Sequence, residues 1–86
     1  MPDVSRFYGI VVGMFFEDHS PPHVHVRYGE FRAKIDIRTL TVLDGRLPPR
    51  ALGLMIEWMS LHQDELLRNW LALETTGKME KIAPLP

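Results

Sequence analysis

Three of the four histidines in this 86-residue chain lie close together, in the segment HSPPHVHV at residues 19–26. His23 and His25 are two positions apart, so on a β-strand their side chains would point to the same side. Such a His-x-His pair can bind zinc or iron, and an imidazole can also act as a general acid or base near neutral pH. The spacing therefore allows a metal site with His19, His23 and His25 as ligands, or a catalytic site. Glu17 or Asp18 could supply a further metal ligand.

The residues that follow predict a β-hairpin that presents these histidines. Residues 23–28 (HVHVRY) and 31–38 (FRAKIDIR) alternate apolar and polar types around Gly29-Glu30. Glycine at the first position of a two-residue loop is typical of a type II′ turn. The expected pairs on the apolar face are Tyr28–Phe31, Val26–Ala33 and Val24–Ile35, and those on the polar face are Arg27–Arg32, His25–Lys34 and His23–Asp36. A shift by one residue would expose the apolar side chains, so the pattern defines the register.

The polar face of this hairpin is basic, although the net charge of the chain is only −1. Its cations are the candidate residues for binding an anion or RNA: Arg27, Arg32, Lys34 and Arg38. The candidate catalytic residues for an RNase-like reaction are His23, His25, Lys34 and Asp36, with Asp36 orienting the ring of His23. The alternative is an ordinary solvated face of a one-sided sheet. Because cationic neighbours disfavour a divalent ion, no metal site is favoured.

The rest of the chain predicts an α+β domain over residues 1–86. Further strands are expected at 7–16 and, shorter, at 40–47, where Asp44-Gly45 would supply a turn. Pro48-Pro49 begins one long helix over about 49–74, and an extended tail follows over 78–86. The apolar stripe expected to face the core is Leu52, Met55, Ile56, Met59, Leu66, Leu67, Trp70 and Leu73. The expected architecture is an antiparallel sheet of three or four strands packed on one C-terminal helix.

A second apolar stripe runs along another side of this helix. Leu54, Trp58 and Leu61 are spaced at i, i+4 and i+7. An exposed stripe with a central tryptophan would form a surface for a protein partner or for self-association. The alternative is that the C-terminal tail or the first loop covers these residues.

Composition excludes several classes of protein. The chain has no cysteine, which excludes disulfides, thiolate chemistry and sulfur-bound zinc. Hydrophobic residues make up 45 % of the chain, enough for one compact core. No signal sequence or membrane-spanning run is present, so we expect a cytoplasmic protein without a membrane partner. No DNA-binding motif is evident, and no cofactor is implied.

The sequence resembles a family of small bacterial proteins called domain of unknown function 4160. The resemblance is carried by SRFYGIVVGMFFEDHSPPHVHVRYGEFRAKIDI, by LPPRALGLMIEWMSLHQDELLRNW and by the closing KIAPL. The family has no settled activity, and its members are often encoded beside another small protein, as in a toxin–antitoxin system. The resemblance thus implies a small protein partner and an RNA-directed role. We expect an interaction module of such a two-gene system; the alternatives are RNA binding or an RNase-like activity at the basic face, and histidine-based metal binding. Whether the protein is an enzyme stays open.

Overall fold

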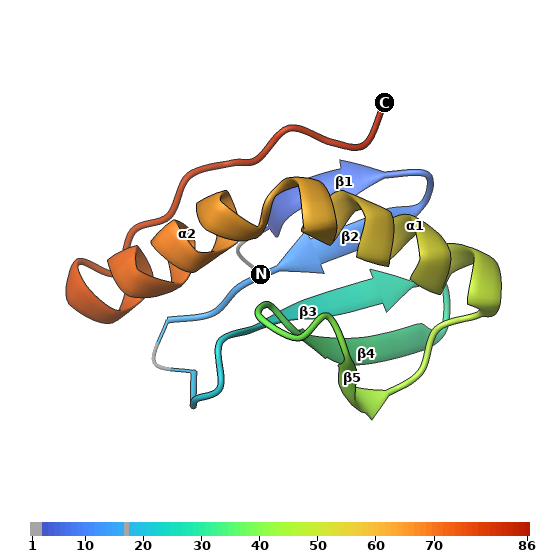
Figure 1. Cartoon of the computed structure of the whole chain (residues 1–86), viewed down its shortest axis with the longest axis horizontal. Coiled ribbons are helices and arrows are strands. Elements are labelled where there is room, and N and C mark those ends of the chain that lie inside the picture. The colour runs from blue at the N-terminus through green and yellow to red at the C-terminus, as the bar shows by residue number, and fades with distance from the viewer. Residues whose placement is uncertain (1–2, 17) are drawn as a thin grey trace.

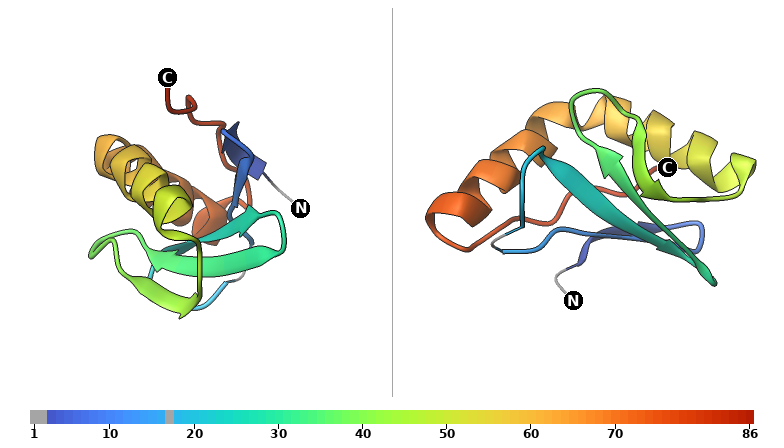
Figure 2. Two further views of the ribbon diagram at one scale, coloured as in Figure 1. Left: turned by 90° about the vertical axis from the view of Figure 1, so that its right-hand side faces the viewer. Right: turned by 90° about the horizontal axis from the view of Figure 1, so that it is seen from below.

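The computed structural model describes residues 3–16 and 18–86 of the chain. These residues form a five-stranded antiparallel sheet in which each strand pairs with the next, followed by two helices that lie across one face of the sheet (Figures 1 and 2). The elements are β1 (Asp3–Phe7), β2 (Ile10–Gly13), β3 (His23–Tyr28), β4 (Phe31–Asp36), β5 (Val42–Gly45), α1 (Pro49–Leu61) and α2 (Gln63–Thr75). The α+β class is confirmed, but there are more strands than expected and two helices instead of one.

The central hairpin of β3 and β4 has the register that alternation predicts. Its six pairs run from His23 opposite Asp36 to Tyr28 opposite Phe31. Gly29 has a φ of +57°, as the first position of the expected turn requires. The apolar face is buried in the core, with Val24 and Ile35 fully inaccessible. The part of the polar face that carries His25 and Lys34 therefore points away from the helices, whereas His23, at the end of the same face, reaches Trp70 of α2.

The expected single strand over residues 7–16 is wrong. It contains a turn at Tyr8-Gly9, where both residues have positive φ, +50° and +81°. This geometry is that of a type I′ turn, which joins β1 to β2. Tyrosine is uncommon at positive φ, and the surrounding residues are typical of a strand. The sequence pattern therefore does not predict this turn. Residues 14–16 leave the sheet after Gly13 and begin the loop toward β3.

The turn expected at Asp44-Gly45 is also displaced. The chain reverses over residues 37–41, where the Leu40 N–H donates to the Asp36 carbonyl oxygen and Leu40 has a φ of +57°. Gly45 instead ends β5, opposite Ala33. Its φ is +74°, and a Cβ atom there would lie 2.1 Å from the Arg32 carbonyl oxygen. Glycine at this position therefore permits close approach of two strands, which alternation alone cannot distinguish from a turn.

The expected helix over residues 49–74 is interrupted at His62, whose φ and ψ are −125° and 21°. The Gln63 side-chain amide donates to the carbonyl oxygens of Ile37 and Arg38, at 2.8 and 3.2 Å. These bonds hold the break against the turn after β4. The residues buried by the helices are Ala51, Met55, Trp58, Met59, Leu66, Asn69, Trp70 and Leu73. The buried face of α1 is thus turned toward Trp58 relative to the expected stripe, with Leu52 and Ile56 only half-buried.

Gln63→Ala is expected to lower the free energy of unfolding by about 1–2 kcal/mol, because two carbonyl groups lose their side-chain donor. Urea denaturation followed by circular dichroism would measure this change. Glu74→Ala, at an exposed position of the same helix, is the control and should alter stability by less than about 0.5 kcal/mol. Equal effects of the two substitutions would show that Gln63 does not hold the helix break.

The C-terminal tail covers Trp58. The Trp58 indole Nε1–H donates to the Ala83 carbonyl oxygen at 2.8 Å, and the ring lies 5.2 Å from that of Phe7 between centroids. The Ile82 N–H donates to the Val4 carbonyl oxygen of β1 at 3.0 Å. Figures 1 and 2 show the tail running back along the helices toward β1. Trp58 has no exposed surface, so the proposed exposed stripe is wrong at its centre.

The flanking members of that stripe differ from each other. Leu54 is half-buried and packs against the core, whereas Leu61 is 64 % exposed. A single exposed leucine is ordinary on a protein surface and does not by itself indicate a partner.

Among the described residues, neither α1 nor α2 has the length and apolar composition needed to cross a membrane.

Candidate metal centre

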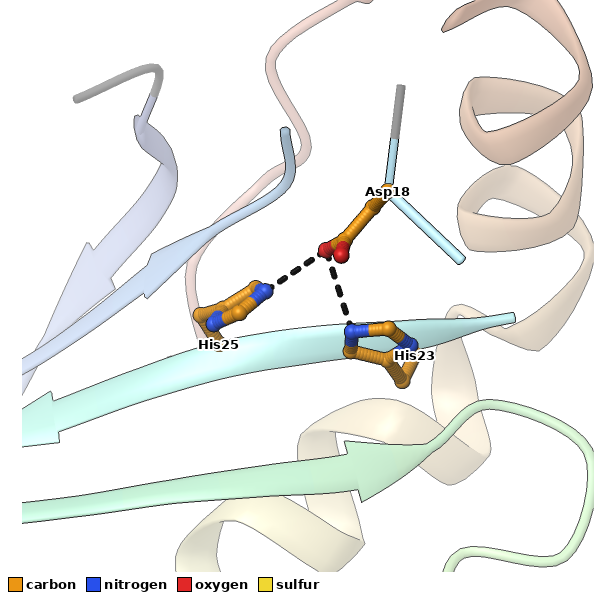
Figure 3. A group of neighbouring side chains, drawn as sticks. All are labelled: Asp18, His23 and His25. Carbon is orange, nitrogen blue, oxygen red and sulfur yellow. Dashed lines mark hydrogen bonds and ion pairs between the residues drawn. The ribbon is translucent and has the colours of Figure 1, made fainter. Parts of the chain in front are cut away.

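Asp18, His23 and His25 converge at the N-terminal end of β3 (Figure 3). The Oδ2 atom of Asp18 lies 2.7 Å from Nε2 of His25 and 3.0 Å from Nε2 of His23. One ligand atom from each of the three residues lies within 4.8 Å of the other two. We call these three residues the Asp–His cluster. Two imidazole nitrogens and one carboxylate oxygen form a ligand set suited to a divalent transition metal.

Two local features of the fold bring the cluster together. Alternation along β3 points His23 and His25 to the same side, as their spacing predicts. Asp18 comes from the loop between β2 and β3, which folds back over the start of β3 (Figure 3). The Pro22 carbonyl oxygen accepts a hydrogen bond of 2.9 Å from the Ile37 N–H, which ties the end of this loop to the end of β4.

The ring of His23 is held in a defined orientation. Its Nδ1 lies 2.7 Å from the Pro21 carbonyl oxygen, which can only accept, so Nδ1 carries a hydrogen and donates it. In the neutral ring, Nε2 then presents its lone pair to the cluster. This Nε2 atom is buried and has no hydrogen-bond partner of acceptable geometry within the described part of the chain. A metal-bound histidine is typically held in this way, with its other nitrogen donating to a carbonyl group.

Aromatic contacts fix the two imidazoles further. The His23 ring packs 5.4 Å from the Trp70 ring of α2, and the residue is only 5 % exposed. The His25 ring meets Phe15 at 4.5 Å and 90°, an edge-to-face contact. His25 is half-buried, and its Nε2 makes the hydrogen bond to Asp18. Within the cluster, the His23 side chain is thus buried and the His25 side chain is accessible to solvent.

The electrostatic environment keeps the Asp18 carboxyl group ionised. Partial burial raises its pKa, but the hydrogen bond from His25 and the charges of His23 and His25 lower it. The N–H of His19 also donates to Asp18, at 3.2 Å. The net result is a pKa below the usual value for aspartate. Asp18 is therefore a carboxylate at neutral pH and available as a metal ligand.

The structure does not bring all the expected site residues together. Asp36 lies opposite His23, but its Oδ1 accepts from the N–H groups of Arg38 and Thr39, at 2.7 and 2.9 Å. The interpretation that Asp36 orients His23 is wrong, because the turn after β4 uses its carboxylate and Pro21 holds the ring. His19 is exposed and is not part of the cluster that the described residues form. Glu17 lies outside the described residues.

The expected basic residues divide between the sheet face and the turn. Arg27 and Arg32 are paired across the β3–β4 hairpin, and Lys34 is paired with His25. Arg32 is exposed and Lys34 is half-buried. Arg38 lies in the turn after β4 and is exposed. Arg32 and Lys34 therefore remain together on the face that carries His25, whereas Arg38 belongs to the reversal of the chain.

A family model described as Domain of unknown function (DUF4160) matches residues 9–71, which include the whole Asp–His cluster. The resemblance noted from the sequence motifs is thereby confirmed. No curated protein and no solved structure matches the chain.

Proposed function

Since the chain belongs to the DUF4160 family, whose description names no activity, we propose a function from the site itself: the protein binds zinc or a similar divalent transition metal. The ligands are Asp18, His23 and His25. The observation that carries the proposal is the convergence of the two Nε2 atoms on Asp18 Oδ2, while Nδ1 of the buried His23 is held by the Pro21 carbonyl oxygen. His23 Nε2 is buried and lies 3.0 Å from this carboxylate oxygen without hydrogen-bond geometry, an arrangement that an ion bound between the two atoms would satisfy.

The distances in the cluster are those of a site that must rearrange to hold a metal. Zinc–nitrogen and zinc–oxygen bonds of about 2.0–2.1 Å in a tetrahedral site place ligand atoms roughly 3.3 Å apart. Asp18 Oδ2 now lies 2.7 and 3.0 Å from the two Nε2 atoms. To admit the ion, these two distances would widen by a few tenths of an ångström, and the two Nε2 atoms, which lie within 4.8 Å of each other, would come to a similar separation. With three protein ligands, the fourth position of a tetrahedral site is open to water or to a bound ligand.

The cations near His25 do not prevent this function. Lys34 lies opposite His25, and arginines lie on the same face, so the strand register alone predicts a charge that repels a divalent ion. Asp18 supplies a carboxylate at ligand distance, which offsets that positive charge where the ion would bind. The long Lys34 side chain can also carry its ammonium group into solvent. The local charge at the cluster is therefore more favourable than the strand register alone implies.

Two other functions expected from the sequence have less support from the side-chain positions. Burial of Trp58 removes the anchor of the expected partner surface. Burial of His23 keeps its ring from contacting an RNA strand, so His23 and His25 are poorly placed as an exposed acid–base pair. The family context still favours a small protein partner, and a partner test belongs with any study of the metal site.

Zinc titration of the tag-free protein by calorimetry tests the proposed function. We expect one zinc ion per chain, and at least about 100-fold weaker binding in Asp18→Asn, His23→Ala and His25→Ala, because each removes a direct ligand. Cobalt absorption spectra would report the coordination of the same site. The matched controls are His19→Ala and His62→Ala, the two histidines outside the cluster, and both should keep wild-type affinity. Zinc binding that is unaffected by the three ligand substitutions would contradict the proposal.

A further inference from the structure

A groove of about 290 Å³ lies beside the Asp–His cluster on the sheet face that points away from the helices. Its walls come from the loop after β2 and from β3, β4 and β5. His25 and Phe15 line one part, and Arg32 and Lys34 line another. His25 therefore belongs both to the cluster and to the groove.

The two cations of the groove are available to an anionic ligand. Arg32 and Lys34 are two positions apart on β4, so their side chains lie on the same face. Asp44 is opposite Lys34 in the register, yet no salt bridge involves Arg32 or Lys34 among residues 3–16 and 18–86. A guanidinium and an ammonium group side by side are well suited to bind a phosphate group.

The groove also offers flat rings beside these cations. Phe15 is half-buried, and its ring contacts that of His25 edge to face at 4.5 Å. Nucleic-acid bases stack on aromatic side chains with little preference for the base. The volume of the groove lies near the lower limit of small-molecule sites, roughly 300 Å³, so it suits one small ligand with both an apolar and an anionic part.

We infer that this groove binds a nucleotide, with its phosphate at Arg32 and Lys34 and its base against Phe15. The nucleotide is either free or a single unit of an RNA strand. This binding site goes beyond the proposed metal function and shares only His25 with the metal centre. A bound nucleotide would lie next to the metal ion, where the open coordination position could contact it.

Titration of the folded protein with adenosine monophosphate, inorganic phosphate and a short single-stranded RNA, followed by NMR, tests this inference. Adenosine monophosphate should bind more tightly than inorganic phosphate and shift the amide signals of β3 and β4. Replacing both cations (Arg32→Gln with Lys34→Met) should weaken binding at least about tenfold. Phe15→Leu should weaken nucleotide binding at least about fivefold while leaving the affinity for inorganic phosphate unchanged.

Arg50→Gln with Arg68→Gln, two exposed cations on the helices, is the matched control and should not change binding. Equal affinities for the free nucleotide and the RNA would identify the free nucleotide as sufficient, and tighter binding of RNA would identify the strand; both outcomes support the inference. No binding of any phosphate compound would overturn it, as would binding that persists unchanged without Arg32 and Lys34.

The same titrations in zinc and in chelator separate this inference from the proposed function. Nucleotide binding without zinc binding would contradict only the metal site. Zinc binding to the Asp–His cluster without nucleotide binding would contradict only the groove. Because Arg32→Gln with Lys34→Met leaves all three metal ligands in place, this variant should bind zinc as tightly as the wild type.

Discussion

Trp58→Ala is expected to lower the free energy of unfolding by about 3–5 kcal/mol, the range for removing a fully buried large aromatic side chain. Trp58 has no exposed surface, contacts the Phe7 ring and donates to the Ala83 carbonyl oxygen. The substitution would create a cavity and also release the tail from α1. For a domain of this size, such a loss is a large fraction of total stability, which is about 4–13 kcal/mol. Urea denaturation would measure it.

Two controls separate the contributions at this position. Trp58→Phe keeps a buried ring but loses the indole hydrogen bond, so it should cost less than the alanine substitution. Leu61 is part of the same expected stripe but is 64 % exposed. Leu61→Ala should therefore change the free energy of unfolding by less than about 0.5 kcal/mol. A small effect of Trp58→Ala, similar to that of Leu61→Ala, would contradict the covering of Trp58 by the tail and would revive the partner surface.

The central hairpin could be predicted from the sequence because two local signals agree on it. Alternation along residues 23–28 and 31–38 places the apolar side chains on one face, and Gly29 fits the turn between them. A one-residue shift would expose Val24 and Ile35, both fully buried, so burial strongly favours one register. The observed pairs are the predicted ones.

The sequence-based prediction of the fold is wrong where tertiary contacts override the local sequence pattern. The Tyr8-Gly9 turn adopts positive φ at a tyrosine, which propensity does not anticipate. The helix is interrupted near Gln63, whose side chain binds carbonyl groups of residues 37 and 38, about 25 positions earlier in the chain. The orientation of Trp58 depends on Ala83 in the same way. Periodicity within one segment carries no information about such distant partners.

The sequence predicts the two histidines of the candidate site but not the position of Asp18, because only the histidines depend on local pattern alone. The spacing of His23 and His25 places both rings on one side of a strand whatever the rest of the fold. Asp18 could be considered only as a possible ligand, because its position depends on how residues 18–22 fold back over β3. In the observed loop conformation, the Asp18 carboxylate lies within 3.0 Å of the Nε2 atoms of both histidines. The loop conformation changes the favoured chemistry from an exposed basic face to a metal centre.

Zinc at a free concentration 100 times its dissociation constant is expected to stabilise the folded protein by about 2.7 kcal/mol, because the unfolded chain lacks the assembled cluster. For a domain of this length the melting temperature should rise by roughly 10–20 °C. Differential scanning calorimetry with and without zinc would measure this increase, and a chelator should reverse it.

Specificity of this stabilisation distinguishes the Asp–His cluster from weaker sites. Magnesium prefers oxygen ligands in octahedral geometry, so it should not raise the melting temperature. Asp18→Asn keeps the size of the side chain but removes its charge, and it should abolish most of the zinc effect. His62 and Glu65 form the other histidine–carboxylate pair among the described residues, with His62 Nδ1 2.6 Å from Glu65 Oε1. If zinc raised the melting temperature of Asp18→Asn as much as that of the wild type, but not that of His62→Ala, the ion would bind at His62 and Glu65. The loop that carries Asp18 would then have a purely structural role.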